Sequence, residues 1–135
     1  MPCFLPQFLA ALLGLCAVEA SADPLGPSTI WRLREIDGAP FTARATLSFP
    51  EEGRVGGEGP CNTFRATRSL PYPRIEIRNI AATRRICPDN AAEVRFFAAL
   101  EAMTLAEVSD DLLRLTAPAG QEMMFEVQPD LTPRP

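Results

Sequence analysis

The sequence predicts a mainly β domain of the α+β class, a small antiparallel meander or barrel-like sheet with one helix packed against it. Three observations predict this fold. Short segments of alternating apolar and polar residues recur along the chain, with turn-forming residues between them. The 135 residues include 14 prolines, which favours short strands over long helices. Only residues 90–103 place apolar side chains at helical spacing over several turns.

The first residues are typical of an export signal. Residues 8–18 (FLAALLGLCAV) form an apolar run that is too short to span a bilayer as a helix. A small-x-small cleavage site ends at Ala22, so we expect residues 1–22 to be a signal peptide and Asp23 to begin the mature chain. No Lys or Arg precedes the apolar run, which leaves an uncleaved anchor or a misassigned start codon as alternatives.

A cysteine near the end of the apolar run raises the question of a lipid anchor. Lipid attachment requires a small residue directly before the cysteine, and here Leu15 precedes Cys16. We therefore expect a periplasmic or secreted protein without a lipid anchor, and no transmembrane span in the mature chain.

The predicted strands follow one another with short turns between them. In the first, Trp31 and Leu33 share one face, and we place Trp31 in the core rather than on a binding surface. Because tight turns join the strands, neighbours should pair antiparallel, and closure into a barrel would remove exposed edges. The strands are expected at residues 29–36, 45–49, 54–68 (interrupted by glycines), 74–80, 104–108, 111–115 and 122–127. A flexible leader (23–28) and a disordered tail (128–135) flank this domain of residues 29–127.

The stretch RVGGEGPCNTF contains the most distinctive local pattern. Gly57 and Gly59 weaken a strand and permit a bulge or a close backbone approach. A phosphate-binding loop is the alternative, but such a loop should open a helix, and here more strand follows. Asn62 comes after the bend, and we expect its amide to bond backbone groups left unpaired there. A ligand contact is the other interpretation of Asn62.

One helix is expected after residue 87. Asn90 is a good N-cap and Glu93 lies three residues later, as in a capping box. Neighbours on a helix differ by about 100° in direction, so Phe96 and Phe97 cannot both face the sheet fully. One of the two is then left for a cavity or a partner surface. The predicted apolar stripe consists of Phe96, Phe97, Leu100 and Met103, with Val94 beside it.

Cleavage of the signal would remove two of the four cysteines. Cys61 and Cys87 then remain as an even pair in an oxidising compartment, where a disulfide persists. Two buried free thiols are the alternative. Two cysteines alone supply too few ligands for a metal site, so no metal or cofactor is expected.

The residue types that are missing exclude many enzymes. Without histidine the chain has no Ser-His-Asp or Cys-His arrangement, and without lysine it has no P-loop and no Schiff base. A net charge of −4 gives no electrostatic footprint for nucleic acid. We interpret the Arg84-Arg85 pair, like Arg65 and Arg68, as solvated rather than as a binding patch.

Several of these segments together resemble the META domain family, which includes the HslJ-like (DUF306) proteins. The first strand with Trp31 resembles the opening of META domains. The segment GGEGPCNTF, with Gly57, Gly59 and Asn62, resembles the family's glycine-Cys-Asn core. The segment IAATRRICPD is similar to its second signature, in which a threonine, here Thr83, precedes a cysteine at the start of the helix.

The resemblance implies a compact β-rich envelope domain with no established enzymatic activity. Members have been linked to the heat-shock response and to novobiocin resistance, and they resemble a secretin pilot that holds lipid. We therefore expect a non-enzymatic, stress- or drug-tolerance-related accessory or binding module, with an apolar small molecule or lipid, or an envelope protein, as its partner. A carboxylate hydrolase using Glu58 or Asp89 is one alternative. A secreted protease inhibitor presenting residues 70–73 (LPYP) is another.

Overall fold

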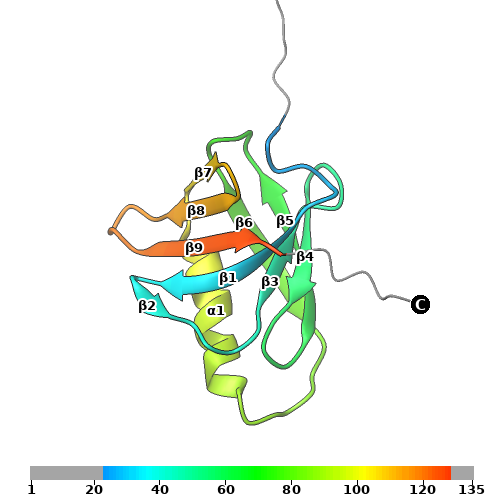
Figure 1. Ribbon diagram of the computed structural model, residues 1–135. Helices are drawn as coiled ribbons and strands as arrows, with labels where there is room; N and C mark the ends of the chain where they lie inside the picture. Colours follow the sequence, from blue (N-terminus) through cyan, green and yellow to red (C-terminus); the bar gives the residue numbers. More distant parts are fainter. Residues whose placement is uncertain (1–22, 129–135) are drawn as a thin grey trace, which may run out of the picture.

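The computed structural model describes residues 23–128, which form one nine-stranded antiparallel sheet and one helix (Figure 1). This confirms the predicted fold class. The first five strands are β1 (Ile30–Ile36), β2 (Ala39–Pro40), β3 (Thr46–Ser48), β4 (Arg54–Glu58) and β5 (Thr63–Ser69). The remaining elements are β6 (Glu76–Ala82), α1 (Asn90–Ala102), β7 (Leu105–Ser109), β8 (Leu112–Thr116) and β9 (Glu122–Val127).

The strands form a meander with one long-range pairing at its centre. Their order across the sheet is β6-β5-β4-β3-β1-β9-β8-β7, and β2 pairs with β1 beside this path. The first long strand therefore lies against the last one, with Trp31 opposite Val127 and Leu33 opposite Phe125. This pairing joins the two halves of the meander into one continuous surface.

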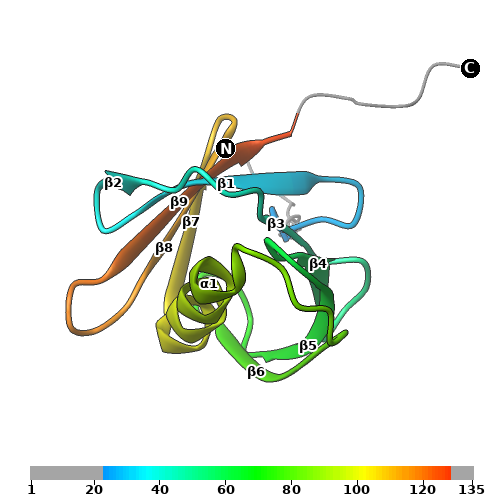
Figure 2. The same cartoon turned by 90° about the horizontal axis from the view of Figure 1, so that it is seen from below.

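The sheet curls strongly into a half-barrel, and α1 occupies its open side (Figure 2). At one end the two edge strands nearly meet, because Arg74 forms an isolated bridge with Leu105. The N–H of Ala106 donates to the carbonyl of Pro73 at 2.7 Å, which extends this contact. Since α1 connects β6 to β7, the helix fills the gap where those edges diverge. Both edges are thereby covered, which limits edge-to-edge association.

Side chains from the sheet and from α1 fill the interior of the half-barrel. Trp31 is 2% exposed, as predicted for a core position, although its indole N–H has no hydrogen-bond partner within residues 23–128. The largest fully buried side chains include Phe49, Phe96, Phe125, Leu33, Leu47, Ile75, Ile77, Leu100, Met103, Leu113, Leu115 and Met123. The space enclosed by the sheet is thus a packed core.

The predicted helical stripe is confirmed, but the capping box is wrong. Phe96, Leu100 and Met103 are at most 1% exposed and face the sheet. The helix begins at Asn90, its N-cap is Asp89, and no side chain bonds the cap. Glu93 does not reach back to the helix start; its carboxylate is buried and serves another part of the chain, described below.

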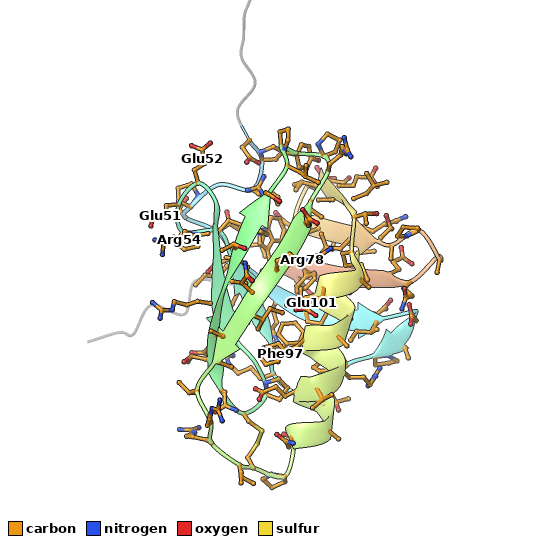
Figure 3. The ribbon with its side chains drawn as sticks, turned by 180° about the vertical axis from the view of Figure 1, so that it is seen from behind. Glu51, Glu52, Arg54, Arg78, Phe97 and Glu101 are labelled. Carbon is orange, nitrogen blue, oxygen red and sulfur yellow. A yellow bond between two sulfur atoms is a disulfide. The ribbon has the colours of Figure 1, made fainter. Side chains whose placement is uncertain are left out.

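Phe97 lies on the flank of α1 that faces the sheet (Figure 3). It is half-buried and meets Phe64 edge-on, with ring centroids 5.2 Å apart. Beside it, the guanidinium of Arg78 on β6 donates to the carbonyl of Glu101 on α1 at 3.2 Å. Neither phenylalanine is left for a cavity, because Phe96 and Phe97 both pack on Phe64.

Some predicted boundaries shift. The strand expected at residues 74–80 is β6, which starts and ends two residues later. The two-residue β2 was not predicted, because it contains Pro40 and has no alternating pattern. No helix within residues 23–128 has the length and apolar character needed to cross a membrane. The predicted signal peptide with Ala22, and residues 129–135 of the tail, lie outside the described residues.

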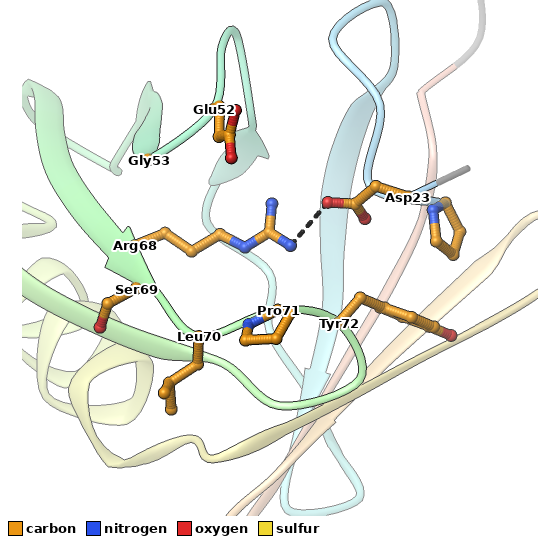
Figure 4. Close-up of a pocket in the computed structure, with 9 residues that line it drawn as sticks. Asp23, Glu52, Gly53, Arg68, Ser69, Leu70, Pro71 and Tyr72 are labelled. Atoms are coloured by element: carbon orange, nitrogen blue, oxygen red, sulfur yellow. Dashed lines mark hydrogen bonds and ion pairs between the residues drawn. The ribbon is translucent and has the colours of Figure 1, made fainter. Parts of the chain in front are cut away.

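The predicted leader, residues 23–28, has two attachments to the domain. Leu25 is 3% exposed and belongs to the core. The carboxylate of Asp23 pairs with the guanidinium of Arg68 at 2.8 Å (Figure 4), and that guanidinium lies 5.3 Å from the centre of the Phe49 ring. The described fold therefore includes Asp23, the residue expected to begin the mature chain.

Candidate functional site

A buried polar network lies where the loop after β4 meets the start of α1. Its centre is Asn62, which is 6% exposed. The Asn62 Nδ2 donates to Oε1 of Glu93 at 2.7 Å and to the carbonyl of Arg85 at 3.2 Å. Its Oδ1 accepts the N–H of Arg85 at 2.6 Å and the hydroxyl of Thr83 at 2.8 Å. The donor nitrogen and the acceptor oxygen of the amide thus both have partners, as a buried amide requires.

Glu93 completes the network from the first turns of the helix. It is 4% exposed, and its Oε2 accepts the backbone N–H groups of Cys61 at 3.0 Å and Asn62 at 2.7 Å. Buried charge is tolerated only where hydrogen bonds replace water. We call this pair of side chains, Asn62 and Glu93, the brace. It ties the loop after β4 to α1 and to the segment after β6.

The disulfide joins the same two segments covalently. Cys61 and Cys87 are bonded, with Cα atoms 5.9 Å apart and a sequence separation of 26. Cys61 is 5% exposed and Cys87 is half-buried. Thr83 is hydrogen-bonded to Asn62, and Cys87 is bonded to Cys61, so residues 83–87 are held at both ends. We call residues 83–87 the braced loop.

Two glycines make this packing possible. A Cβ on Gly59 would lie 2.6 Å from Oε2 of Glu93, so any side chain there displaces the carboxylate of the brace. Gly57 has a φ of +155°, and a Cβ would overlap the carbonyl oxygen of Thr46 on β3. The predicted close approach of backbone is therefore real, and at Gly57 it is strand against strand.

Replacing Gly57 with alanine should lower the free energy of unfolding by about 2 kcal/mol, because a backbone carbonyl cannot move aside without shifting β3. Gly26 is the matched control, since a Cβ there lies 4.0 Å from the nearest atom. Gly26→Ala should change stability by less than about 0.5 kcal/mol. Chemical denaturation of the two variants measures both values, and equal stabilities would contradict the contact at Gly57.

The braced loop presents its side chains to solvent. Arg84 and Arg85 are exposed, and Ile86 is 93% exposed, the highest value among large apolar side chains of residues 23–128. Neither guanidinium has an ion-pair or hydrogen-bond partner within the described residues. A rigid backbone therefore carries two arginines and an isoleucine that the fold itself does not use.

A hollow of about 450 Å³ lies at the foot of the braced loop. Arg44 and Glu58 form an ion pair at its rim, with Nε and Oε1 3.2 Å apart. It is lined by Arg44, Glu58, Gly59, Pro60, Cys61, Asn62, Thr63, Thr83 and Arg85. Asn62 lines this hollow, and its side-chain amide bonds the backbone of Arg85, as the first of the two interpretations of Asn62 expected.

The other sequence candidates lie apart from the brace or in solvent. The carboxylates proposed for a hydrolase, Glu58 and Asp89, are both on exposed residues. Among residues 23–128, no group of three or more His, Cys, Asp or Glu side chains could hold a metal ion. The acidic pair Glu51-Glu52 is exposed at the turn between β3 and β4 (Figure 3).

Residues 70–73, the loop suggested for a protease inhibitor, fold back onto the domain. The hydroxyl of Tyr72 accepts the N–H of Val108 on β7 at 2.9 Å. The N–H of Arg74 donates to the carbonyl of Pro71 at 2.9 Å, closing the turn. Together with Asp23 and Arg68, this loop lines an open hollow of about 520 Å³ (Figure 4). The loop thus caps the edge of β7.

The roles of Glu93 and Arg85 were missed by sequence reasoning. Each acts through partners more than 20 residues away, so no local spacing reveals them. Thr83 and Asn62 were found through the pattern around the cysteines, and the structure brings them together.

Solved structures of low sequence identity have the same fold. An NMR structure of a protein from Burkholderia xenovorans has a TM-score of 0.61 at 19% identity, covering 87% of this chain and 99% of that one. A second NMR structure has a TM-score of 0.64 at 20% identity, covering 84% and 100%. The crystal structure of a DUF4847 family protein from Bacteroides vulgatus has a TM-score of 0.62 at 13% identity, covering 74% and 92%.

Sequence comparison identifies the family directly. No curated protein matches the chain. A family model described as META domain matches residues 24–130, which include every described strand, the helix, the brace and the disulfide. The chain belongs to the META domain family.

Proposed function

We propose that this META domain protein is a non-enzymatic binding module of the bacterial envelope, and that it acts through its outer surface. The braced loop is the observation that carries the proposal. Three hydrogen bonds to the side chain of Asn62 and one disulfide hold a segment whose own side chains, Arg84, Arg85 and Ile86, contribute little to the core. Exposed polar and apolar side chains on a rigid loop are typical of binding sites.

The packed interior supports surface binding over carriage of a lipid inside the sheet. Leu33, Phe96 and Phe125 are each 2% exposed or less and lie among the buried side chains that fill the half-barrel. A lipid-holding domain needs an apolar cavity of several hundred cubic ångströms. The hollows described above are open and lie at the surface.

An oxidising compartment outside the cytoplasm is part of the same proposal. The Cys61–Cys87 bond supports it, because structural disulfides persist in such compartments. We expect the full chain, expressed in a Gram-negative host, to be recovered from the periplasm or medium as a polypeptide beginning at Asp23. Intact-mass measurement of each fraction checks this. A cytoplasmic, full-length product would contradict it.

Deletion of the gene is expected to lower tolerance to heat or to an envelope-acting drug such as novobiocin. Complementation with the wild-type chain should restore tolerance, whereas a chain with Arg84, Arg85 and Ile86 all replaced by serine should not. The triple variant should keep wild-type abundance, because the three side chains are exposed. Unchanged tolerance of the deletion strain across these stresses would refute the accessory role, and full complementation by the triple variant would refute the surface.

A further inference from the structure

The braced loop continues the extended path of β6 beyond the last rung of the sheet. The N–H of Thr83 donates to the carbonyl of Thr63 at 3.1 Å. Two residues on, the N–H and carbonyl of Arg85 both bond the side-chain amide of Asn62. In an extended chain the backbone groups of successive residues point to opposite edges. The amide of Asn62 therefore replaces a peptide group of the neighbouring strand and extends the ladder by one rung.

Arg84 lies between these two rungs, so its N–H and carbonyl point away from Asn62. No hydrogen bond to the backbone of Arg84 is present within residues 23–128. Its side chain is exposed and unpaired among the same residues. Beyond Arg85, the nearly fully exposed Ile86 precedes the disulfide at Cys87. One residue thus offers a cationic side chain and both backbone groups to a partner.

We propose that the braced loop is a substrate-like loop that binds the active-site cleft of an arginine-specific serine protease and inhibits it. Arg84 enters the specificity pocket, and the Arg84–Arg85 peptide bond lies at the nucleophile. This inference rests on the proposed function, because it names the partner of the surface described there.

The chemistry of such a protease matches what the loop presents. Its pocket carries a carboxylate for the guanidinium, and its oxyanion hole needs a carbonyl free of other hydrogen bonds. Arg84 meets both requirements, whereas the carbonyl of Arg85 is already occupied by Asn62. Extended peptides bind such clefts through backbone hydrogen bonds, as an added strand. A loop already held in that shape loses less conformational freedom on binding.

The brace also explains inhibition rather than ordinary cleavage. Attack of the protease serine on the Arg84 carbonyl would form an acyl-enzyme and free the amine of Arg85. In a flexible substrate that amine departs, and water hydrolyses the ester to a carboxylate. Here Asn62 and the Cys61–Cys87 bond hold residue 85 in place. The amine can attack the ester again, which re-forms the peptide bond and releases the serine.

Titration of the purified, disulfide-bonded mature protein into trypsin tests the proposal, with cleavage of a fluorogenic arginine substrate as the readout. We expect inhibition with a dissociation constant below about 1 μM, since protease–inhibitor interfaces of standard size are tight. Elastase, whose pocket admits only small side chains, should not be inhibited. Absence of trypsin inhibition at about 100 μM protein would overturn the proposal.

Neighbouring arginines give matched variants. Arg84→Ala should weaken inhibition by about 100-fold, because it removes the group that fills the pocket. Arg84→Lys should retain most of it, and Arg85→Ala should change it less than about 10-fold. Equal losses for Arg84→Ala and Arg85→Ala would overturn the assignment of Arg84. Rapid, complete conversion to two disulfide-linked fragments without inhibition, seen by mass spectrometry after reduction, would show a substrate and also overturn it.

The two proposals fail separately. If trypsin is not inhibited while the triple serine variant still fails to complement the deletion strain, the protease partner is wrong and the surface-binding function stands. If the triple serine variant complements the deletion strain fully, the proposed function itself is refuted.

Discussion

Replacing Asn62 with aspartate is expected to destabilise the protein by about 4 kcal/mol, because it sets a second buried carboxylate against Glu93. In the wild-type protein the Asn62 Nδ2 is 2.7 Å from Oε1 of Glu93 and donates to it. The new oxygen would also face the carbonyl of Arg85. Both contacts turn from attraction to repulsion without any change in side-chain volume. Urea denaturation of the mature protein measures the loss.

A second substitution tests whether the loss comes from this contact. Glu93→Gln in the Asn62→Asp background restores one donor between the two side chains and leaves an acceptor oxygen for the backbone N–H groups of Cys61 and Asn62. We expect about half of the lost stability to return. Asn90→Asp is the control, since Asn90 is exposed in the first turn of α1, where a negative charge is favourable. Additive effects of the two substitutions at the brace would contradict the direct contact.

Removing the disulfide is expected to cost about 3–4 kcal/mol. The bond closes a loop of 26 positions, and the chain-entropy model assigns that much to the restriction of the unfolded chain. The variant Cys61→Ser/Cys87→Ser should therefore unfold at a much lower urea concentration. For a domain of this size, that is a large share of a total stability of about 5–15 kcal/mol.

Reduction provides the control for the disulfide. In excess reductant the wild-type protein and the double serine variant should have nearly the same stability, because the remaining difference is a buried thiol against a hydroxyl at position 61. Thiol labelling of the unfolded, unreduced mature protein should find no free cysteine. A loss below about 1 kcal/mol in the variant would show that the disulfide restricts the unfolded chain far less than the chain-entropy model assigns.

Comparison of the sequence with the fold shows which signals are local. Phe96, Leu100 and Met103 were placed correctly because helical spacing is a property of one segment. Glu93 was misassigned because a capping box is identified from residues of one helix alone. Its actual partners, Cys61 and Asn62, are distant in the sequence and lie beside it because the sheet curls. A rule that examines four residues at a time cannot identify a partner more than 30 positions away.

The candidate site was predictable only in part for the same reason. The glycine-Cys-Asn segment signalled an unusual backbone, and the cysteine pair implied its covalent partner. The interpretation of Arg84-Arg85 as merely solvated agrees with their exposure. It did not anticipate that hydrogen bonds and a disulfide hold the backbone of this segment. The order of this backbone depends on Asn62, which directly precedes β5 and lies beside the segment after β6 because β5 and β6 pair in the sheet.

The pairing of β1 with β9 has a consequence for how the protein is made. Trp31 lies opposite Val127, so the central seam of the sheet joins strands from the two ends of the domain. Contacts between such distant residues raise the contact order, which slows folding relative to a sheet built from local hairpins alone. The seam cannot form before β9 has been synthesised. Until then the polypeptide lacks the pairing that joins the two halves of its sheet and is open to chaperones.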